Sequence, residues 1–163
     1  MTKIGLLSDT HGHLDDKVLG FFKNVDEIWH AGDFGSIEVL EKLQNFKTLK
    51  AVYGNIDGHD IRAGLTAHLR FMCEDVDVWI THIGGYPGNY SRYVKQGILI
   101  NPPKLFISGH SHICKVINDK KLNLLHINPG AYGKSGLHNV RTAVRFEIDK
   151  NNIQNLEVFE IKR

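Results

Sequence analysis

The sequence predicts an α/β protein in which stacked sheets are flanked by helices. The first half alternates short apolar runs with amphipathic segments, and the second half consists mainly of strand-like runs separated by turns. The chain has 163 residues, enough to bury a core without disulfides or structural metals. A (β/α)₈ barrel is disfavoured because it typically needs ~250 residues. We therefore expect one domain spanning residues 1–163.

The first half predicts three repeats of a strand that ends in a polar or glycine-containing loop. Residues 3–7 are almost continuously apolar, which is typical of a strand buried on both faces, and the run stops at Ser8. Apolar residues at helical spacing follow the first two strands. The predicted elements are strands over 3–7, 27–30 and 48–53, a helix over 15–23 and a second helix capped by Ser36.

The second half predicts a hairpin followed by mostly β structure. Residues 69–72 and 76–80 form the hairpin, a glycine-rich loop spans 84–89, and a short helix is expected over 90–96. Little helix is expected beyond that point, so we predict an antiparallel meander. Its strands would span 105–108, 114–117, 122–127, 143–148 and 153–161.

Composition narrows the classes of function. The net charge of +2 provides no polybasic surface, so nothing indicates nucleic-acid binding. No apolar run approaches the ~20 residues of a membrane span, and the apolar stretch at the start is too short for a signal peptide, so we expect a cytoplasmic protein. Cys73 and Cys114 lack CxxC spacing, which favours reduced thiols.

Side chains able to bind a metal follow the predicted strands. The carboxyl ends of strands in such sheets converge on one crevice, so these side chains are expected to form one site. In extended geometry residues i and i+2 point the same way, so each Asp-x-His or His-x-His pair would present two ligands together. The residues are Asp9, His11, Asp33, Asn55, His82, His110 and His112.

Simpler interpretations exist for each residue alone. Asp33 and Asn55 are equally typical of turns or helix caps, and His82 of a hydrogen-bonded structural histidine. The metal interpretation depends on all seven occupying equivalent positions after successive strands. Jointly they provide the ligands that two adjacent metal ions sharing one carboxylate would need.

In order and spacing, these residues resemble the five motif blocks of the calcineurin-like metallophosphoesterase superfamily. The resemblance is closest to its small bacterial and archaeal phosphodiesterases, which share a fold with the retromer subunit VPS29. It covers essentially the whole chain and implies a four-layer α/β/β/α sandwich of two mixed sheets, with a dinuclear metal centre. The matching segments are Asp9-Thr10-His11, Gly32-Asp33, Gly54-Asn55, His82 and Gly109-His110-Ser111-His112.

The resemblance also implies how the ligands divide between two divalent ions. One ion would be held by Asp9, His11, Asp33 and His112, and the other by Asp33, Asn55, His82 and His110. Asp33 would bridge them. Imidazole, carboxylate and amide ligands suit manganese, iron, zinc or nickel better than calcium, and we expect manganese.

The implied activity is hydrolysis of a small phosphate ester, most closely a phosphodiester, by a hydroxide shared between the ions. Catalytic roles would fall to Asp33, Asn55 and His110, and substrate contacts to Asn55, His13 and His59. Many family members carry a histidine after the motif asparagine that protonates the leaving group. Here that position is Ile56, which predicts weak activity favouring aryl esters.

The alternative is a weakly active or non-catalytic VPS29-like scaffold that binds other proteins. Missing ligands would favour it, but all seven are present. Tyr86, Tyr90, Tyr93 and Ile98 are candidates for a protein interface, including that of a homodimer.

Overall fold

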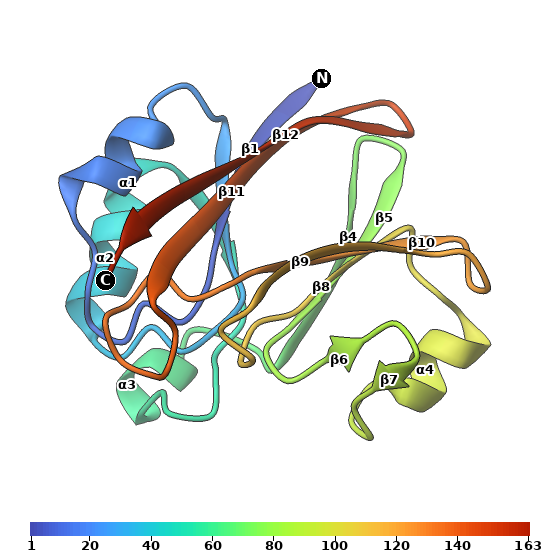
Figure 1. Cartoon of the computed structure of the whole chain (residues 1–163), viewed down its shortest axis with the longest axis horizontal. Coiled ribbons are helices and arrows are strands. Elements are labelled where there is room, and N and C mark those ends of the chain that lie inside the picture. Colours follow the sequence, from blue (N-terminus) through green and yellow to red (C-terminus); the bar gives the residue numbers. More distant parts are fainter.

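The computed structural model describes residues 1–163 and contains two five-stranded sheets. Figure 1 shows four layers, with α1 and α2 covering one sheet and α4 the other. The elements are β1 (Thr2–Leu7), α1 (Asp16–Phe21), β2 (Glu27–His30), α2 (Ile37–Phe46), β3 (Thr48–Ala51), α3 (His59–Arg62), β4 (His68–Cys73), β5 (Val76–Thr81), β6 (Gly85–Tyr86), β7 (Asn89–Tyr90), α4 (Lys95–Ile100), β8 (Leu105–Ile107), β9 (Cys114–Asp119), β10 (Leu124–Pro129), β11 (Val140–Asp149) and β12 (Asn152–Lys162).

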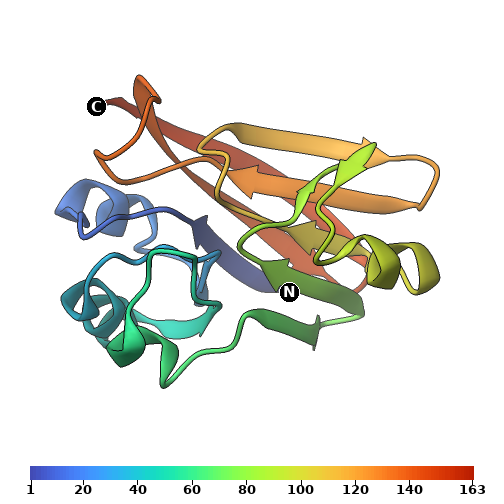
Figure 2. The ribbon, with the colours of Figure 1, turned by 90° about the horizontal axis from the view of Figure 1, so that it is seen from below.

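Both sheets are mixed. The first has the order β12-β11-β1-β2-β3, with β1, β2 and β3 parallel and β11 antiparallel to β1. The second has the order β4-β5-β8-β10-β9, with β5, β8 and β10 parallel and the edge strands antiparallel. Seen from below in Figure 2, α1, α2 and α3 lie on one side and α4 on the other. The predicted four-layer sandwich of two mixed sheets is confirmed.

Three apolar layers hold the four structural layers together. The largest cluster has 15 buried residues and lies between the sheets, around Trp29, Ile80 and Phe146. A second cluster of 13 packs the first sheet against α1 and α2. A third cluster of four, including Ile98 and Phe106, packs α4 against the second sheet.

None of the helices has the length and apolar character needed to cross a membrane.

Two of the predictions for the second half are wrong. The helix expected over 90–96 starts at Lys95, because residues 85–86 and 89–90 pair as a short hairpin and the helix is positioned by packing Val94 and Ile98 on the second sheet. The expected meander is divided between the sheets. After β10 the chain crosses to the first sheet, where β11 covers the free edge of β1.

Several further boundaries differ from the prediction, and α3 was not expected. Its formation follows from Ile61, which is buried in the apolar cluster that also contains residues of α2.

Ile98, a candidate interface residue, is fully buried in the core, whereas Tyr86 and Tyr93 are exposed. Asp15, the predicted start of the first helix, lies just before it and accepts a hydrogen bond from the Val18 amide as its N-cap.

Gly5 in the middle of β1 allows α1 to approach the first sheet. A Cβ at this position would lie 2.7 Å from Phe22 Cδ1 and 2.9 Å from Ile28 Cδ1, both buried atoms. Gly20, in α1, has no atom within 4 Å of its corresponding position. The two glycines therefore differ in packing.

Gly5→Ala should destabilise the protein by about 1–3 kcal/mol, because the added methyl group overpacks the core. Gly20→Ala is the matched control and should raise stability by roughly 0.5–1 kcal/mol, as expected for a helix position with free space. Urea unfolding of both variants measures the difference. Equal stabilities would contradict this account of the α1 packing.

Candidate metal centre

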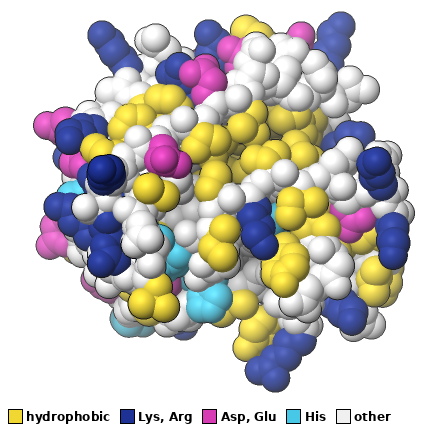
Figure 3. Space-filling view, viewed as in Figure 1, with side chains coloured by type: hydrophobic (Ala, Val, Ile, Leu, Met, Phe, Trp, Pro, Cys, Tyr) yellow, Lys and Arg dark blue, Asp and Glu magenta, His cyan; other side chains and the backbone are white.

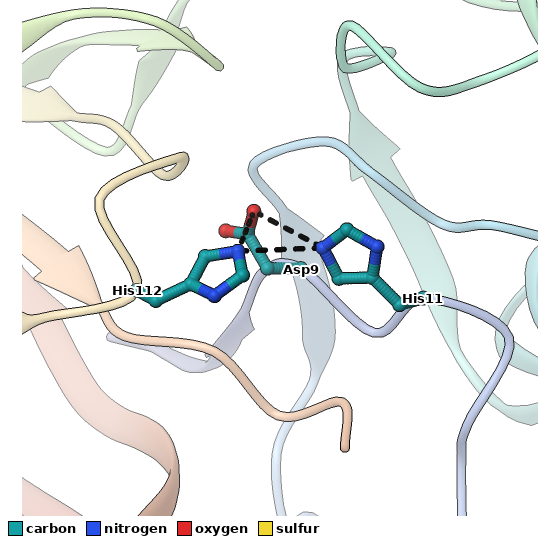
Figure 4. A group of neighbouring side chains, drawn as sticks. All are labelled: Asp9, His11 and His112. Carbon is teal, nitrogen blue, oxygen red and sulfur yellow. Dashed lines mark hydrogen bonds and ion pairs between the residues drawn. The ribbon is translucent and has the colours of Figure 1, made fainter. Parts of the chain in front are cut away.

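The predicted ligands converge at one end of the sheets in two groups of three. The first group is Asp9, His11 and His112, and the second is Asp33, His82 and His110. Within each group the potential ligand atoms lie within 4.8 Å of one another. In Figure 4 the side chains of the first group point toward one another, from the loop after β1 and the loop before β9. Histidine side chains also reach the surface in the lower half of the face in Figure 3.

Asp33 lies between the two groups. Its Oδ2 atom is 3.2 Å from His82 Nε2 in the second group and 3.8 Å from His11 Nε2 in the first. Asp9 Oδ1 is 3.1 Å from His112 Nε2 and 3.8 Å from His11 Nε2. Both carboxylates are almost completely buried. The two groups are therefore adjacent, and the Asp33 carboxylate faces ring nitrogens of both.

The His82 ring is held by one backbone carbonyl and faces two side-chain oxygens of the site. Its Nδ1 lies 2.8 Å from the Ala31 carbonyl and donates to it, which leaves the Nε2 lone pair facing the site in the neutral ring. Nε2 is 2.9 Å from Asn55 Oδ1 and 3.2 Å from Asp33 Oδ2, and both of these atoms are acceptors. A carbonyl contact of this kind is how metal-bound histidines are commonly oriented.

Asp9 gives a second indication. Its Oδ2 accepts hydrogen bonds from Ser8 Oγ at 2.5 Å and from the His110 amide at 3.0 Å. Its Oδ1 is buried, faces the first group and has no hydrogen-bond partner. A buried carboxylate oxygen without a donor is costly unless a cation neutralises it. The residues present therefore fit divalent metal ions at both groups.

The backbone at these residues differs from the extended geometry assumed from the sequence. Asp9, His11, Asp33, His110 and His112 all have positive φ, between 46° and 67°. The alternation of a strand therefore does not orient these pairs, and that part of the prediction is wrong. The left-handed turns send His110 to the second group and His112 to the first, although one serine separates them.

Glycines before the site residues allow the loops to approach closely. A Cβ at Gly54 would lie 2.0 Å from Asp33 Oδ1, and a Cβ at Gly109 would lie 2.2 Å from Ser8 Oγ. Backbone hydrogen bonds join the same loops, including Asp9 N to Gly32 O at 2.9 Å and Gly109 N to His82 O at 3.0 Å. These glycines place the ligand loops in contact.

His30 is a buried residue that supports the ligand loops, and it was not identified from the sequence. Gly32 N donates to its Nδ1 at 3.1 Å, and its Nε2 lies 3.1 Å from Thr10 Oγ1. The ring stacks on Phe34 with centroids 3.7 Å apart. His30 thus connects the loop carrying Asp33 to the loop carrying Asp9 and His11. Its position at the end of β2 was the available signal.

Two other supporting residues were also missed. Asn128 donates to Gly109 O at 2.9 Å and to Ser111 Oγ at 3.1 Å, which holds the loop of His110 and His112. Asp57 accepts hydrogen bonds from Gly54 N at 2.8 Å and Gly35 N at 3.0 Å, which holds the turn containing Asn55. Their roles depend on loop geometry, which no local sequence pattern encodes.

The two further histidines predicted to contact substrate lie outside both groups. His13 Nε2 is 3.2 Å from Asp15 Oδ2 and 2.8 Å from Arg141 Nη1, in a network behind the first loop. His59 is exposed at the start of α3. Their substrate contacts stay predictions.

The electrostatics of the site favour bound positive charge. Burial raises the pKa of Asp9, but the neighbouring His11, His112 and His82 rings and the hydrogen bond from Ser8 outweigh it and hold the pKa well below its usual range. Burial lowers the pKa of His82, but Asp33 and Asp9 reverse the effect, so the pKa is raised. Burial and the nearby His82 charge lower the pKa of His110.

The buried imidazoles outside the ligand groups predict acid sensitivity. Burial lowers the pKa of His30 to about 3 and that of His126 to about 4. Both pKa values lie below the ordinary histidine value of about 6.5 that applies in the unfolded chain. Below pH 6.5 the two imidazoles are therefore protonated in the unfolded chain and neutral in the folded protein, so unfolding takes up protons and stability falls as the pH falls. Histidines with a raised pKa, such as His82, are protonated in both states there and add no slope.

Between pH 6.5 and 4.5 the free energy of unfolding of the metal-free protein should fall by about 1.4 kcal/mol per pH unit for each of the two imidazoles. His126→Gln should reduce the slope of the unfolding free energy against pH by the contribution of one imidazole, about 1.4 kcal/mol per pH unit. Urea unfolding across the pH range measures the slope. A stability that is constant from pH 6.5 to 4.5 would contradict the burial of neutral His30 and His126.

Comparisons with known proteins agree with this geometry. Residues 2–151 match the model of the calcineurin-like phosphoesterase superfamily domain. Phosphodiesterase MJ0936 of Methanocaldococcus jannaschii is 31% identical over 146 residues, covering 78% of this chain and 82% of that protein.

Solved structures show the same fold. An archaeal phosphodiesterase has a TM-score of 0.74 at 26% identity, covering 96% of this chain and 99% of that one. Vps29 of Entamoeba histolytica, solved with zinc, has a TM-score of 0.75 at 14% identity, covering 98% of each chain. The sequence matches extend this likeness from fold to family. The chain belongs to the calcineurin-like phosphoesterase superfamily.

Proposed function

We propose that this protein is a metal-dependent phosphoesterase that hydrolyses a small phosphodiester. Membership of the calcineurin-like phosphoesterase superfamily and the relative named phosphodiesterase support a hydrolase acting on phosphate esters. The observation that carries the proposal is the position of Asp33 Oδ2, within 3.8 Å of His11 Nε2 and 3.2 Å of His82 Nε2. A single carboxylate oxygen directed at both groups is what two neighbouring cations would share.

In this proposal each ligand group holds one divalent ion. Asp9, His11 and His112 would hold the first, His82, His110 and Asn55 would hold the second, and Asp33 would contribute to both. When bound, the two ions supply a water of lowered pKa as nucleophile and positive charge for the phosphoryl oxygens. Manganese is the metal we propose, with nickel, zinc and iron as alternatives.

The chain's own residues orient the substrate and limit the chemistry. Asn55 and His110 are the exposed members of the site, so they lie where a phosphate ester would first make contact. Asn55 Oδ1 faces His82, which leaves its amide N–H groups free to donate to a phosphoryl oxygen. The lowered pKa of His110 favours the neutral ring at neutral pH.

Ile56 follows Asn55, is 49% exposed and has a side chain that cannot donate a proton to the leaving group. A general acid typically contributes 10²–10⁴-fold to the rate. We therefore propose that esters with good leaving groups, such as aryl esters, are hydrolysed fastest.

The same proposal places the protein in the cytoplasm, treats residues 1–163 as one domain and allows a homodimer. The second candidate function, a VPS29-like scaffold, is favoured by the structural likeness to Vps29. It is the weaker candidate because a side chain able to bind a metal occupies every expected ligand position.

Asp33→Asn should lower the hydrolysis of bis(p-nitrophenyl) phosphate by the manganese-loaded protein at least about a hundredfold, because the shared negative charge is lost. Asp16→Asn is the matched control, since the Asp16 side chain is 96% exposed on α1, and it should keep full activity. The assay uses chelated protein resupplied separately with manganese, nickel, zinc or magnesium.

Full activity of Asp33→Asn would remove the shared role of this carboxylate. Equal inertness of the unmodified protein with every metal, toward both nitrophenyl mono- and diesters, would favour the scaffold instead.

A further inference from the structure

A pocket of about 320 Å³ opens directly beside the second ligand group. Asn55 and His82 form one wall of the pocket and also belong to the candidate metal centre. The rest of the wall comes from the loop after β3, the end of α3, the start of β4, the end of β5 with the loop after it, and the segment before α4. The other lining residues are Tyr53, Gly54, Arg62, Ala67, His68, Thr81, Ile83 and Tyr93.

The pocket presents aromatic faces and uncompensated positive charge. Arg62 and Tyr53 both line the pocket, and the Arg62 guanidinium carbon lies 4.6 Å from the centroid of the Tyr53 ring. Arg92 does not line the pocket, but its guanidinium carbon lies 5.1 Å from the centroid of the Tyr93 ring. Arg62 donates only to backbone carbonyls, those of Asp57, Gly54 and Asn55. No carboxylate lines the pocket.

Tyr93 is the most accessible of these aromatic groups. Its side chain is part of the lining and is 59% exposed, and the segment that carries it is not a strand of either sheet. An exposed ring beside a guanidinium offers a flat surface for another aromatic ring. A simple alkyl group would gain little from such a surface.

We propose that this pocket binds an aromatic ester group of the phosphodiester, with the Tyr93 ring as its stacking surface. The phosphate would then lie at Asn55 and His82, and its ester group would extend toward Tyr93. The substrate class is thus a diester with an aryl or nucleoside substituent. This inference rests on the function proposed above, because it assumes that the phosphate binds at the adjacent metal centre.

The test is direct binding of two phosphonates to the manganese-loaded protein by calorimetry. Phenylphosphonate and methylphosphonate carry the same anionic group and no leaving group, so they differ only in the substituent. The unmodified protein should bind phenylphosphonate about tenfold more tightly, the gain typical of one aromatic stacking contact. Tyr93→Ala should reduce this preference to about threefold or less, with the affinity for methylphosphonate unchanged.

Two control variants isolate the role of the ring. Tyr93→Phe keeps the ring and should keep the tenfold preference. Tyr86→Ala removes another exposed tyrosine, which does not line the pocket, and should also keep it. Arg62 is unsuitable for this purpose because it holds the backbone of the Asn55 turn.

The outcomes separate this inference from the proposed function. Binding of both phosphonates with equal affinity, or an unchanged preference in Tyr93→Ala, would overturn the aromatic subsite and leave the metal centre intact. Binding of neither phosphonate would overturn the phosphate site and the subsite together. Phenyl and nucleoside substituents are then distinguished by repeating the titration with thymidine 5′-monophosphate.

Discussion

Two buried carboxylates facing a ring of imidazoles impose the main constraint on this structure. Asp9 and Asp33 lie at 0% and 2% exposure, and four histidines direct a ring nitrogen at them. Burying two negative charges without compensation would be strongly unfavourable. Bound cations would satisfy this need, because His82 Nε2, Asn55 Oδ1 and Asp33 Oδ2 face one another and the buried Asp9 Oδ1 has no hydrogen-bond donor. The geometry of the surrounding loops serves this convergence.

The loops keep this arrangement through local strain and close contacts. Five of the seven predicted ligands have a left-handed backbone, a conformation that costs roughly 1–3 kcal/mol per residue outside glycine. Three apolar layers and the hydrogen bonds between the loops compensate for this cost. His30 and Asn128 also hold the loops, through hydrogen bonds to the backbone of Gly32 and Gly109. The ligand positions therefore depend on the packing of the sheets and on these contacts between the loops.

The sequence allowed the fold class and the ligand residues to be predicted, because both depend on local patterns. Apolar runs that end in polar residues mark the strands of the first half, and the ordered ligand motifs mark the site. Sheet membership of β9 to β12 was not predictable, since an alternating run does not encode which sheet it joins. Only the family resemblance predicted that His110 and His112 join different ligand groups. Strand geometry would have pointed both side chains the same way, but both residues have positive φ and are not extended. The pocket at Tyr93 was not predictable, because residues from five separate segments between Tyr53 and Tyr93 line it.

The central claim is that the two groups hold two cations with Asp33 between them. Anomalous diffraction at the manganese absorption edge, from crystals grown with manganese, tests this claim most directly. We expect two anomalous peaks, one among Asp9, His11 and His112 and one among His82, His110 and Asn55, with Asp33 next to both. A map without peaks at these side chains, or with a single peak that Asp33 does not contact, would contradict the account.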